Sequence, residues 1–379
     1  MLAVGMVRGK PGVHAFELPV PGIKQPDEVL VRVKEVGLDG TDFNLVRHNL
    51  QDIAEGRNEM AMGHEMVGVV EAVGSGIRSL AVGDPVTMTV RRGCGICQPC
   101  LHNQSDMCMT GLFTERGIHK LDGFLTQFVV DLEQYIVKVP REAAWCGVLT
   151  EPLSIAEKGI EQIRFIQSRM AWACPHPDHT FDSGGWGGCR TALVVGAGPL
   201  GLLGTALLRL AGVNTYVADI VSEDSPKVHL VKHLGAIYID ARTKTPKEMV
   251  ELCCTAGNLD IIFEASGAAA TAVELISFMS RSSIYVMTGI PREGVPLQVD
   301  AGQLVRQIVR YNQVVVGSVN SNRSHFEMAV KDIPQIDSQF SGMLKEMFTH
   351  RFRLEDYERA FALSDPKHIK TVIEVEPWN

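Results

Sequence analysis

The sequence predicts an α/β protein with two domains, in which a β-rich domain precedes a doubly wound parallel sheet. Residues 1–140 consist mainly of short β-branched runs separated by Gly, Pro and Asp, and no long helical period lies between them. Further along, strand-like and helix-like segments alternate, a pattern typical of a parallel sheet covered by helices. The length of 379 residues is enough for two domains at about 150 residues each.

Each predicted element depends on a local pattern. The strand-like runs of the first domain are EVLVRVKEVG, MVGVVEAVG, DPVTMTV and QYIVKVP. A helix is predicted from Pro152, because apolar residues in PLSIAEKGIEQIRFI recur mainly at helical spacing and proline suits a first turn. Residues 169–190 are irregular, and we predict a surface loop there. The later strands are TALVVG, NTYVADI, LDIIFEAS, SSIYVMTG, QVVVGSV and the final KTVIEV.

Composition excludes several classes of function. The chain has 36 basic and 44 acidic residues, and the net charge of −8 argues against nucleic acid or an anionic membrane as a partner. We therefore expect a small-molecule substrate. We also predict a homo-oligomer, either a dimer or a tetramer, although no motif indicates its oligomeric state. The N-terminus lacks a secretory pattern, and the nine cysteines include one tight cluster, which favours metal binding over disulfides. A cytoplasmic location follows from that cysteine usage.

A glycine-rich motif follows the strand TALVV and opens a predicted helix. A lone motif of this kind is weak evidence, but its place between strand and helix is typical of a dinucleotide site. The glycines permit a tight turn, close approach of a pyrophosphate and close helix–strand packing, and the alternative is a turn that binds nothing. The motif comprises Gly196, Gly198, Pro199, Leu200 and Gly201.

Asp219 ends the next predicted strand and is the candidate for selecting the cofactor. Its carboxylate can accept hydrogen bonds from both ribose hydroxyls, whereas it would repel the 2′-phosphate of NADP. No arginine follows it in the segment DIVSED. We therefore predict that NAD is preferred over NADP; the alternative for Asp219 is a surface cap.

Four cysteines at C-x2-C-x2-C-x7-C spacing predict a structural zinc site. Four thiolates surround zinc tetrahedrally and leave no open position for a substrate. The alternative is a coincidence of free thiols, and the nearby His102 is expected to be solvated. The predicted ligands are Cys94, Cys97, Cys100 and Cys108.

A second small group, Cys174, His176 and His179, has no evident fourth ligand. We interpret it as a loop with incidental side chains, and a metal site is the alternative.

The segment GHEMVGVVEAVG contains His64 and Glu65, and VGDPV follows at residues 82–86. Together with the cysteine cluster and the nucleotide motif, it resembles the zinc-dependent medium-chain dehydrogenase/reductase superfamily over essentially the whole chain. TGLFTERGIHKLDGF, TEPLSIAEKGIEQI and VVVGSVNSNRSHFEMAV are most similar to the archaeal-type glucose 1-dehydrogenase group. The resemblance implies a GroES-like β-barrel catalytic domain (1–155 and 325–379) and a Rossmann nucleotide-binding domain (156–324).

The resemblance also implies a catalytic zinc site. The family binds this zinc through a residue of a C-G-T-D-like segment, the His of GHE and a glutamate. Asp39 stands here where most members have cysteine, while His64 follows the pattern. Both Glu65 and Glu151 are candidates for the acidic ligand, and which of them binds directly stays open. Carboxylates make the site harder than one with cysteine, so selectivity for zinc should be weaker.

In the glucose 1-dehydrogenase group, an acidic residue before GIHK, a residue before the PL pair and the asparagine of a V-N segment hold sugar hydroxyls. The matching residues are Glu115, Glu151 and Asn320. Two positions that are polar in relatives are Val90 and Ile155 here, which puts glucose specificity in doubt.

The predicted activity is NAD-dependent oxidation of a glucose-like aldose at its anomeric carbon to the lactone. Thr41, which takes a proton from the sugar, and the zinc ligand His64 are the predicted catalytic residues. A dehydrogenase of another alcohol or polyol is one alternative. The other is a non-catalytic nucleotide-binding scaffold, which the retained metal and proton-transfer residues disfavour.

Overall fold

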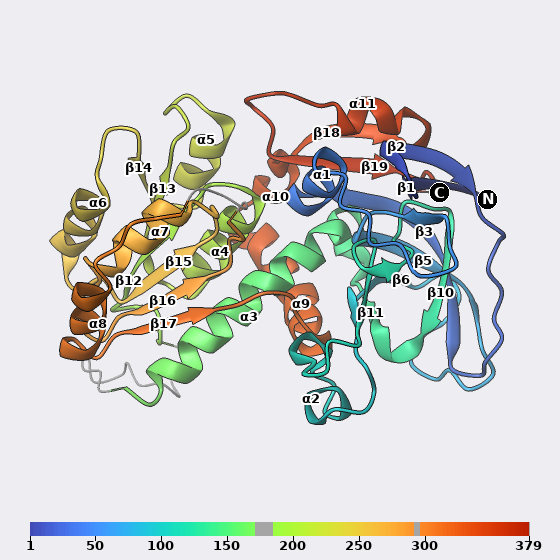
Figure 1. Cartoon of the computed structure of the whole chain (residues 1–379), viewed down its shortest axis with the longest axis horizontal. Helices are drawn as coiled ribbons and strands as arrows, with labels where there is room; N and C mark the ends of the chain where they lie inside the picture. The colour runs from blue at the N-terminus through green and yellow to red at the C-terminus, as the bar shows by residue number, and fades with distance from the viewer. Residues whose placement is uncertain (171–184, 292–295, 379) are drawn as a thin grey trace. The chain divides into compact units, whose positions relative to one another are not determined.

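A computed structural model describes residues 1–170, 185–291 and 296–378 (Figure 1). Contacts between Cα atoms divide the chain into two compact units. Unit 1 comprises residues 1–154, 320–334 and 344–379, and unit 2 comprises residues 155–319 and 335–343. Most of the predicted loop and the group of Cys174, His176 and His179 lie outside the described residues.

Unit 1 is built mainly from β-strands. Its largest sheet has the order β11-β6-β5-β3-β19-β18, with β10 paired to β3, and two smaller sheets have the orders β2-β1-β4 and β7-β8-β9. Alternate residues of β3, such as Val29, Val31 and Val33, are fully buried, because side chains on a strand alternate between its faces. The strands are β1 (Leu2–Val7), β2 (Lys10–Glu17), β3 (Glu28–Leu38), β4 (Glu59–Ala61), β5 (Glu65–Val73), β6 (Pro85–Met88), β7 (Arg91–Arg92), β8 (Thr114–Arg116), β9 (Lys120–Leu121), β10 (Phe128–Leu132), β11 (Ile136–Lys138), β18 (Phe348–Arg353) and β19 (Lys370–Glu374).

Short helices interrupt these strands, and the sequence patterns did not predict them. Helix α1 (Gly40–Arg47) begins at Asp39, whose side chain accepts from the backbone N–H groups of Thr41 and Asp42. Eight residues are too few to show a helical period, so the capping residues were the only available signal. The other short helices of unit 1 are α2 (Gln98–Leu101), η1 (Ser105–Met107), η2 (Glu133–Tyr135), η3 (Arg141–Leu149), η5 (Leu354–Asp356) and α11 (Tyr357–Phe361).

The C-terminal strand β19 pairs antiparallel with β3 in the largest sheet of unit 1. The predicted strand KTVIEV is thus confirmed, and its first residue, Lys370, is fully buried. Helices α3 (Thr150–Gln167), α9 (Arg323–Gln339) and α10 (Met343–Met347) each contribute residues to both units. Helix α3 confirms the helix predicted from the PLSIAEKGIEQIRFI segment.

Unit 2 contains a six-stranded parallel sheet of order β14-β13-β12-β15-β16-β17. Phe263 contacts Gly159 of α3 and Gly204 of α4 on one face, while the neighbouring Ile262 belongs to a core cluster with residues of α6 and α7 on the other. Helices therefore cover both faces, as predicted. The elements are β12 (Thr191–Val195), β13 (Asn214–Asp219), β14 (Ile237–Asp240), β15 (Ile261–Glu264), β16 (Ile284–Met287), β17 (Val314–Gly317), α4 (Pro199–Leu210), α5 (Pro226–His233), α6 (Pro246–Cys253), η4 (Cys254–Ala256), α7 (Ala269–Ile276) and α8 (Ala301–Arg310).

Strand β14 and helices α6, α7 and α8 were absent from the elements predicted for unit 2. Strand β14 has only four residues, and a capping box on Thr245 and Glu248 begins the short α6. None of the helices in the described part of the chain is both long and apolar enough to cross a membrane.

Candidate active site and metal centres

Three predicted metal ligands come together in unit 1. Each of Asp39, His64 and Glu65 offers one ligand atom, and these atoms lie within 4.8 Å of one another. His64 and Glu65 are 4% and 1% exposed. A neutral imidazole and two carboxylates match the ligand types and charge of a divalent cation such as zinc. The residues present therefore fit the predicted metal.

Asp42 lies beside this group, and the sequence analysis missed it. Its carboxylate is fully buried, with Oδ1 3.6 Å from Nδ1 of His64, while Asp39 Oδ1 lies 3.7 Å from the other ring nitrogen, Nε2. Burial alone would lower the pKa of His64, but Asp39 and Asp42 raise it well above its usual range. The negative charges around His64 therefore favour a cation at this position. In metal sites, the ring nitrogen of histidine that does not bind the metal usually faces a carboxylate or a carbonyl oxygen.

Lys370 of β19 is the second residue that the sequence analysis missed. Its ammonium group forms a buried ion pair with Glu65 Oε2. A Cβ atom at Gly37 would lie 2.1 Å from that carboxylate oxygen and 2.9 Å from Cε of Lys370, so only glycine leaves room for the pair. Burial raises the pKa of Glu65, and the positive charge of Lys370 opposes this rise.

Glu151, at the start of α3, is buried close enough to interact electrostatically with the group. It is not among the three residues whose ligand atoms lie within 4.8 Å of one another. Burial raises its pKa to about 8, and the negative charges of Glu65 and Asp39 contribute, although His64 opposes them. A neutral Glu151 would add no surplus negative charge beside the other two carboxylates.

Thr41 lies next to the metal-binding group. Its backbone N–H donates to Asp39 Oδ1 at 2.7 Å, and its hydroxyl donates to Oδ2 at 3.1 Å. The first turn of α1 thus fixes the predicted ligand and the predicted proton-transfer residue together.

The predicted sugar-binding residues Glu115 and Asn320 are in contact. Asn320 Nδ2 donates to Glu115 Oε1 at 2.5 Å, and Asn320 Oδ1 accepts from the N–H of Ser321 at 2.9 Å. Residues 205 positions apart in the sequence therefore meet within unit 1. Val90 is 2% exposed, so an apolar side chain at that position is buried rather than presented to solvent.

The four cysteines lie close together in the half-buried segment 94–108, which we call the cysteine lobe. Their sulfur atoms lie within 4.8 Å of one another, with Sγ of Cys94 and Sγ of Cys100 3.8 Å apart. A Cβ atom at Gly93 would lie 2.4 Å from Sγ of Cys100, so glycine is needed there. Hydrogen bonding from Thr110 lowers the pKa of Cys94 to about 6, which favours the thiolate form that binds metal. His102 is exposed, as predicted.

The three glycines of the motif in unit 2 have the backbone geometry that was predicted for them. Gly196 has φ of +101°, and a Cβ atom at Gly201 would lie 1.9 Å from the carbonyl oxygen of Gly196. Gly198 has open space around it and precedes α4, where free N–H groups can face phosphates. Asp219 accepts from the N–H groups of Ala197 at 2.5 Å and Ile220 at 2.6 Å, which fixes its carboxylate beside the motif.

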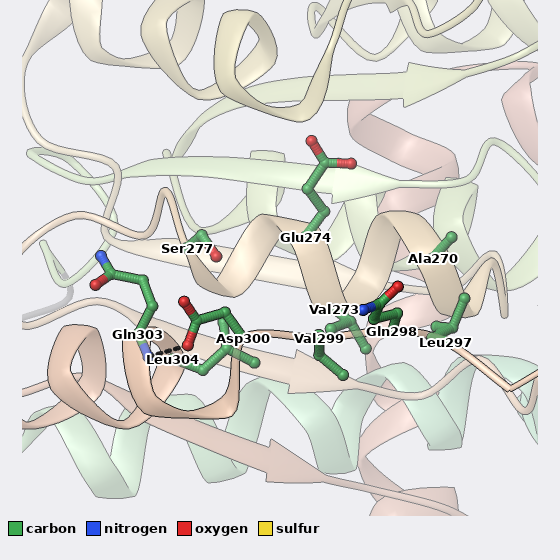
Figure 2. Close-up of a pocket in the computed structure, with 10 residues that line it drawn as sticks. All are labelled: Ala270, Val273, Glu274, Ser277, Leu297, Gln298, Val299, Asp300, Gln303 and Leu304. Atoms are coloured by element: carbon green, nitrogen blue, oxygen red, sulfur yellow. Dashed lines mark hydrogen bonds between the residues drawn. The ribbon is translucent and has the colours of Figure 1, made fainter.

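A pocket elsewhere in unit 2 contains none of these residues. It lies between α7 and the segment that enters α8 (Figure 2). Among the described residues that line it, only Glu274 and Asp300 are ionisable, and Asp300 caps α8 by accepting from the N–H of Gln303. The pocket therefore does not belong to the predicted sites.

Comparisons with known proteins agree with this arrangement. The alcohol dehydrogenase GroES-like domain matches residues 25–141, and the glucose dehydrogenase C-terminus matches residues 144–375. Glucose 1-dehydrogenase of Methanocella arvoryzae is 34% identical over 358 residues, which cover 94% of each chain. The chain belongs to the archaeal glucose dehydrogenase group of the zinc-dependent medium-chain dehydrogenases. It is therefore an oxidoreductase that acts on a CH–OH group, and the predicted family is confirmed.

Solved structures confirm the predicted fold class. Glucose dehydrogenase of Haloferax mediterranei in complex with NADP, Zn and gluconolactone has a TM-score of 0.87 and 31% identity, and the match covers 100% of both chains. Galactitol-1-phosphate dehydrogenase of Escherichia coli has a TM-score of 0.78 at 22% identity, over 99% of this chain and 100% of the other. The latter likeness concerns the fold alone.

Proposed function

We propose that the protein oxidises an aldose of the glucose type at its anomeric carbon to the lactone, with NAD as the hydride acceptor. The observation that carries this proposal is the grouping within unit 1 of the metal-binding residues with Thr41 and of Glu115 with Asn320. The glucose 1-dehydrogenase relatives and the gluconolactone-bound neighbour support the same substrate class.

Asp39, His64 and one of Glu65 and Glu151 would hold the catalytic zinc. Zinc supplies Lewis-acid chemistry that lowers the pKa of a bound hydroxyl. Asp42 places a negative charge 3.6 Å from Nδ1 of His64, and Lys370 balances the negative charge of Glu65, so buried charges of the chain surround the group. The hydroxyl of Thr41 acts as a relay, because it can take the proton of the anomeric hydroxyl while it gives its own proton to water. Glu115, Glu151 and Asn320 orient the sugar by hydrogen bonds to its other hydroxyls.

We also propose a structural zinc ion on Cys94, Cys97, Cys100 and Cys108. The spacing of the four sulfur atoms supports a closed tetrahedral site. A cytoplasmic location and a homo-oligomeric state stay predictions.

The preference for NAD over NADP rests on Asp219. A charged hydrogen bond contributes roughly 1.5–3 kcal/mol, which corresponds to about ten- to a hundredfold in affinity. Ile220 is exposed beside it, so Asp219→Ser combined with Ile220→Arg should shift the preference toward NADP without disturbing the core. Equal kcat/KM values for the two cofactors in the natural protein would overturn this assignment.

A dehydrogenase of another alcohol or polyol is the second candidate. Val90 and Ile155 favour it, because they are apolar where the resemblance implies polar residues. One experiment decides between the two, namely kcat/KM with NAD for glucose, galactose, xylose and simple alcohols, with and without a chelator. The proposal expects an aldose to be preferred and the chelator to abolish turnover. A higher value for ethanol or a secondary alcohol would replace the sugar assignment.

A further inference from the structure

We infer that Arg91 is a positioning residue that ties the sugar-binding carboxylate of Glu115 to the cysteine lobe. This inference rests on the proposed function, since it concerns how Glu115 is held for the substrate. Arg91 and Glu115 face each other as a cross-strand pair of β7 and β8. Their side chains are each only 12% exposed.

The guanidinium of Arg91 has two partners in addition to an aromatic face. Nε and Nη2 both lie 2.9 Å from Glu115 Oε1, and Nη1 donates to the carbonyl oxygen of Asp106 at 2.7 Å. The guanidinium carbon lies 4.0 Å from the centre of the Phe113 ring. Both nitrogens converge on one oxygen, so the planar guanidinium holds Oε1 in place more firmly than the point charge of a lysine would.

The two carboxylate oxygens of Glu115 differ in their hydrogen bonds. Oε1 receives Arg91 and Asn320 together, whereas no donor among the described residues hydrogen-bonds Oε2. One oxygen is thus used to fix the carboxylate, and the other stays able to accept from a sugar hydroxyl. A carboxylate held in this way binds a hydroxyl without first losing its own rotational freedom.

The contact with Asp106 connects this arrangement to the cysteines. Asp106 belongs to η1, between Cys100 and Cys108, and Ser105 Oγ donates to the carbonyl oxygen of Arg91 at 3.3 Å. Arg91 therefore contacts the loop that the four cysteines enclose through both its side chain and its backbone. The cysteine lobe takes part in sugar binding through Arg91, although none of its cysteines is predicted to touch the sugar.

The test compares Arg91→Met with Arg92→Met. Arg92 is the adjacent residue of β7, pairs with Asp131 at 2.6 Å and lies over the ring of Tyr135 at 4.2 Å, so it matches Arg91 in charge and stacking. Arg91→Met should raise KM for glucose and the Kd for gluconolactone at least about tenfold, because Glu115 is no longer held for its charged hydrogen bond to the sugar. The value of kcat, KM for NAD and the zinc content should stay near those of the natural protein.

Two further measurements separate positioning from general destabilisation. A double-mutant cycle with Glu115→Gln should show that Arg91→Met adds little once the carboxylate is gone. A crystal structure of Arg91→Met should show Glu115 turned away from Asn320. The inference is overturned if Arg92→Met raises the gluconolactone Kd equally, or if Glu115 keeps its orientation in Arg91→Met.

Failure of the proposed function would look different. In that case the natural protein would neither bind gluconolactone nor oxidise any aldose, whatever residue stands at position 91. The orientation of Glu115 in the Arg91→Met crystal structure would then decide the positioning role alone.

Discussion

The two groups of unit 1 that we propose as metal sites differ in how their negative charge is balanced. The cysteine group consists of four identical ligands that are all partly exposed, so water can solvate the negative charge that four thiolates leave in excess. The group of Asp39, His64 and Glu65 is largely buried, and the chain supplies the charges around it, namely Asp42 behind the histidine and Lys370 against the glutamate. The comparison teaches that the proposed structural site is supported by small local features such as Gly93 and Thr110, whereas the proposed catalytic site is surrounded by buried charged residues.

The largest expected effect comes from a substitution in the buried group, and it is an effect on turnover. His64→Ala removes a ligand from the buried group and should lower kcat at least about a thousandfold, since metal polarisation contributes several kcal/mol to the barrier. His102→Ala, in the exposed part of the cysteine lobe, is the matched control and should leave kcat unchanged. Steady-state kinetics with zinc analysis measures both, and a His64→Ala protein with full activity would exclude this group as the reactive centre.

The next prediction tests the buried charge that surrounds the proposed catalytic site, namely the ion pair between Lys370 and Glu65. Lys370→Met leaves Glu65 without its buried cation and should lower the free energy of unfolding of the metal-free protein by about 3–5 kcal/mol. Added zinc should restore much of that loss. Lys138→Met is the control, because Lys138 pairs with Asp84 while 54% exposed and such pairs contribute at most about 1 kcal/mol. Denaturant unfolding with and without zinc would contradict the idea if both variants behaved alike.

Cys97→Ser probes the other group. The protein should lose about one zinc ion per chain and melt several degrees lower, because metal binding stabilises the folded lobe. The change in kcat should be much smaller than that of His64→Ala. Cys254→Ser, which alters a cysteine outside the cluster, should keep its zinc. Unchanged metal content and melting in Cys97→Ser would show that the four cysteines do not form a site.

The smallest effect resolves which glutamate binds the catalytic metal. Removing a direct ligand should weaken zinc binding far more than removing a supporting residue, for which about ten- to a hundredfold is typical. Glu65→Gln and Glu151→Gln should therefore differ, and because Glu65 is held by Lys370, we expect the larger loss with Glu151→Gln. Competition with a zinc-binding dye gives both affinities. Equal losses would mean that the two carboxyl groups share the metal.

The sequence alone predicted the fold class and the residues that the structure brings together in the candidate sites, because those residues lie in compact motifs. GHE, the cysteine spacing and the glycine motif each fix several residues within a short segment. Asp42 was missed although it stands three residues after Asp39, where a capping box would have indicated it.

Lys370, Gly37 and Arg91 could not be found in this way. Lys370 meets Glu65 only because β19 pairs with β3, a contact that joins distant parts of the chain. Gly37 was an unremarked glycine within a predicted strand, and its importance appears only when a Cβ atom is placed against the ion pair. Arg91 was hidden for a similar reason, since its role depends on the pairing of β7 with β8. Sequence patterns indicate ligands, whereas the partners of those ligands come from tertiary pairing.

The late position of Lys370 also has a consequence during synthesis. The ribosome makes Asp39, His64 and Glu65 early, then all of unit 2, and only afterwards the strand that carries Lys370. Until β19 has been synthesised and pairs with β3, Glu65 has no buried cation opposite it. The group of Asp39, His64 and Glu65 therefore reaches its final charge balance only after the whole parallel sheet of unit 2 has been made.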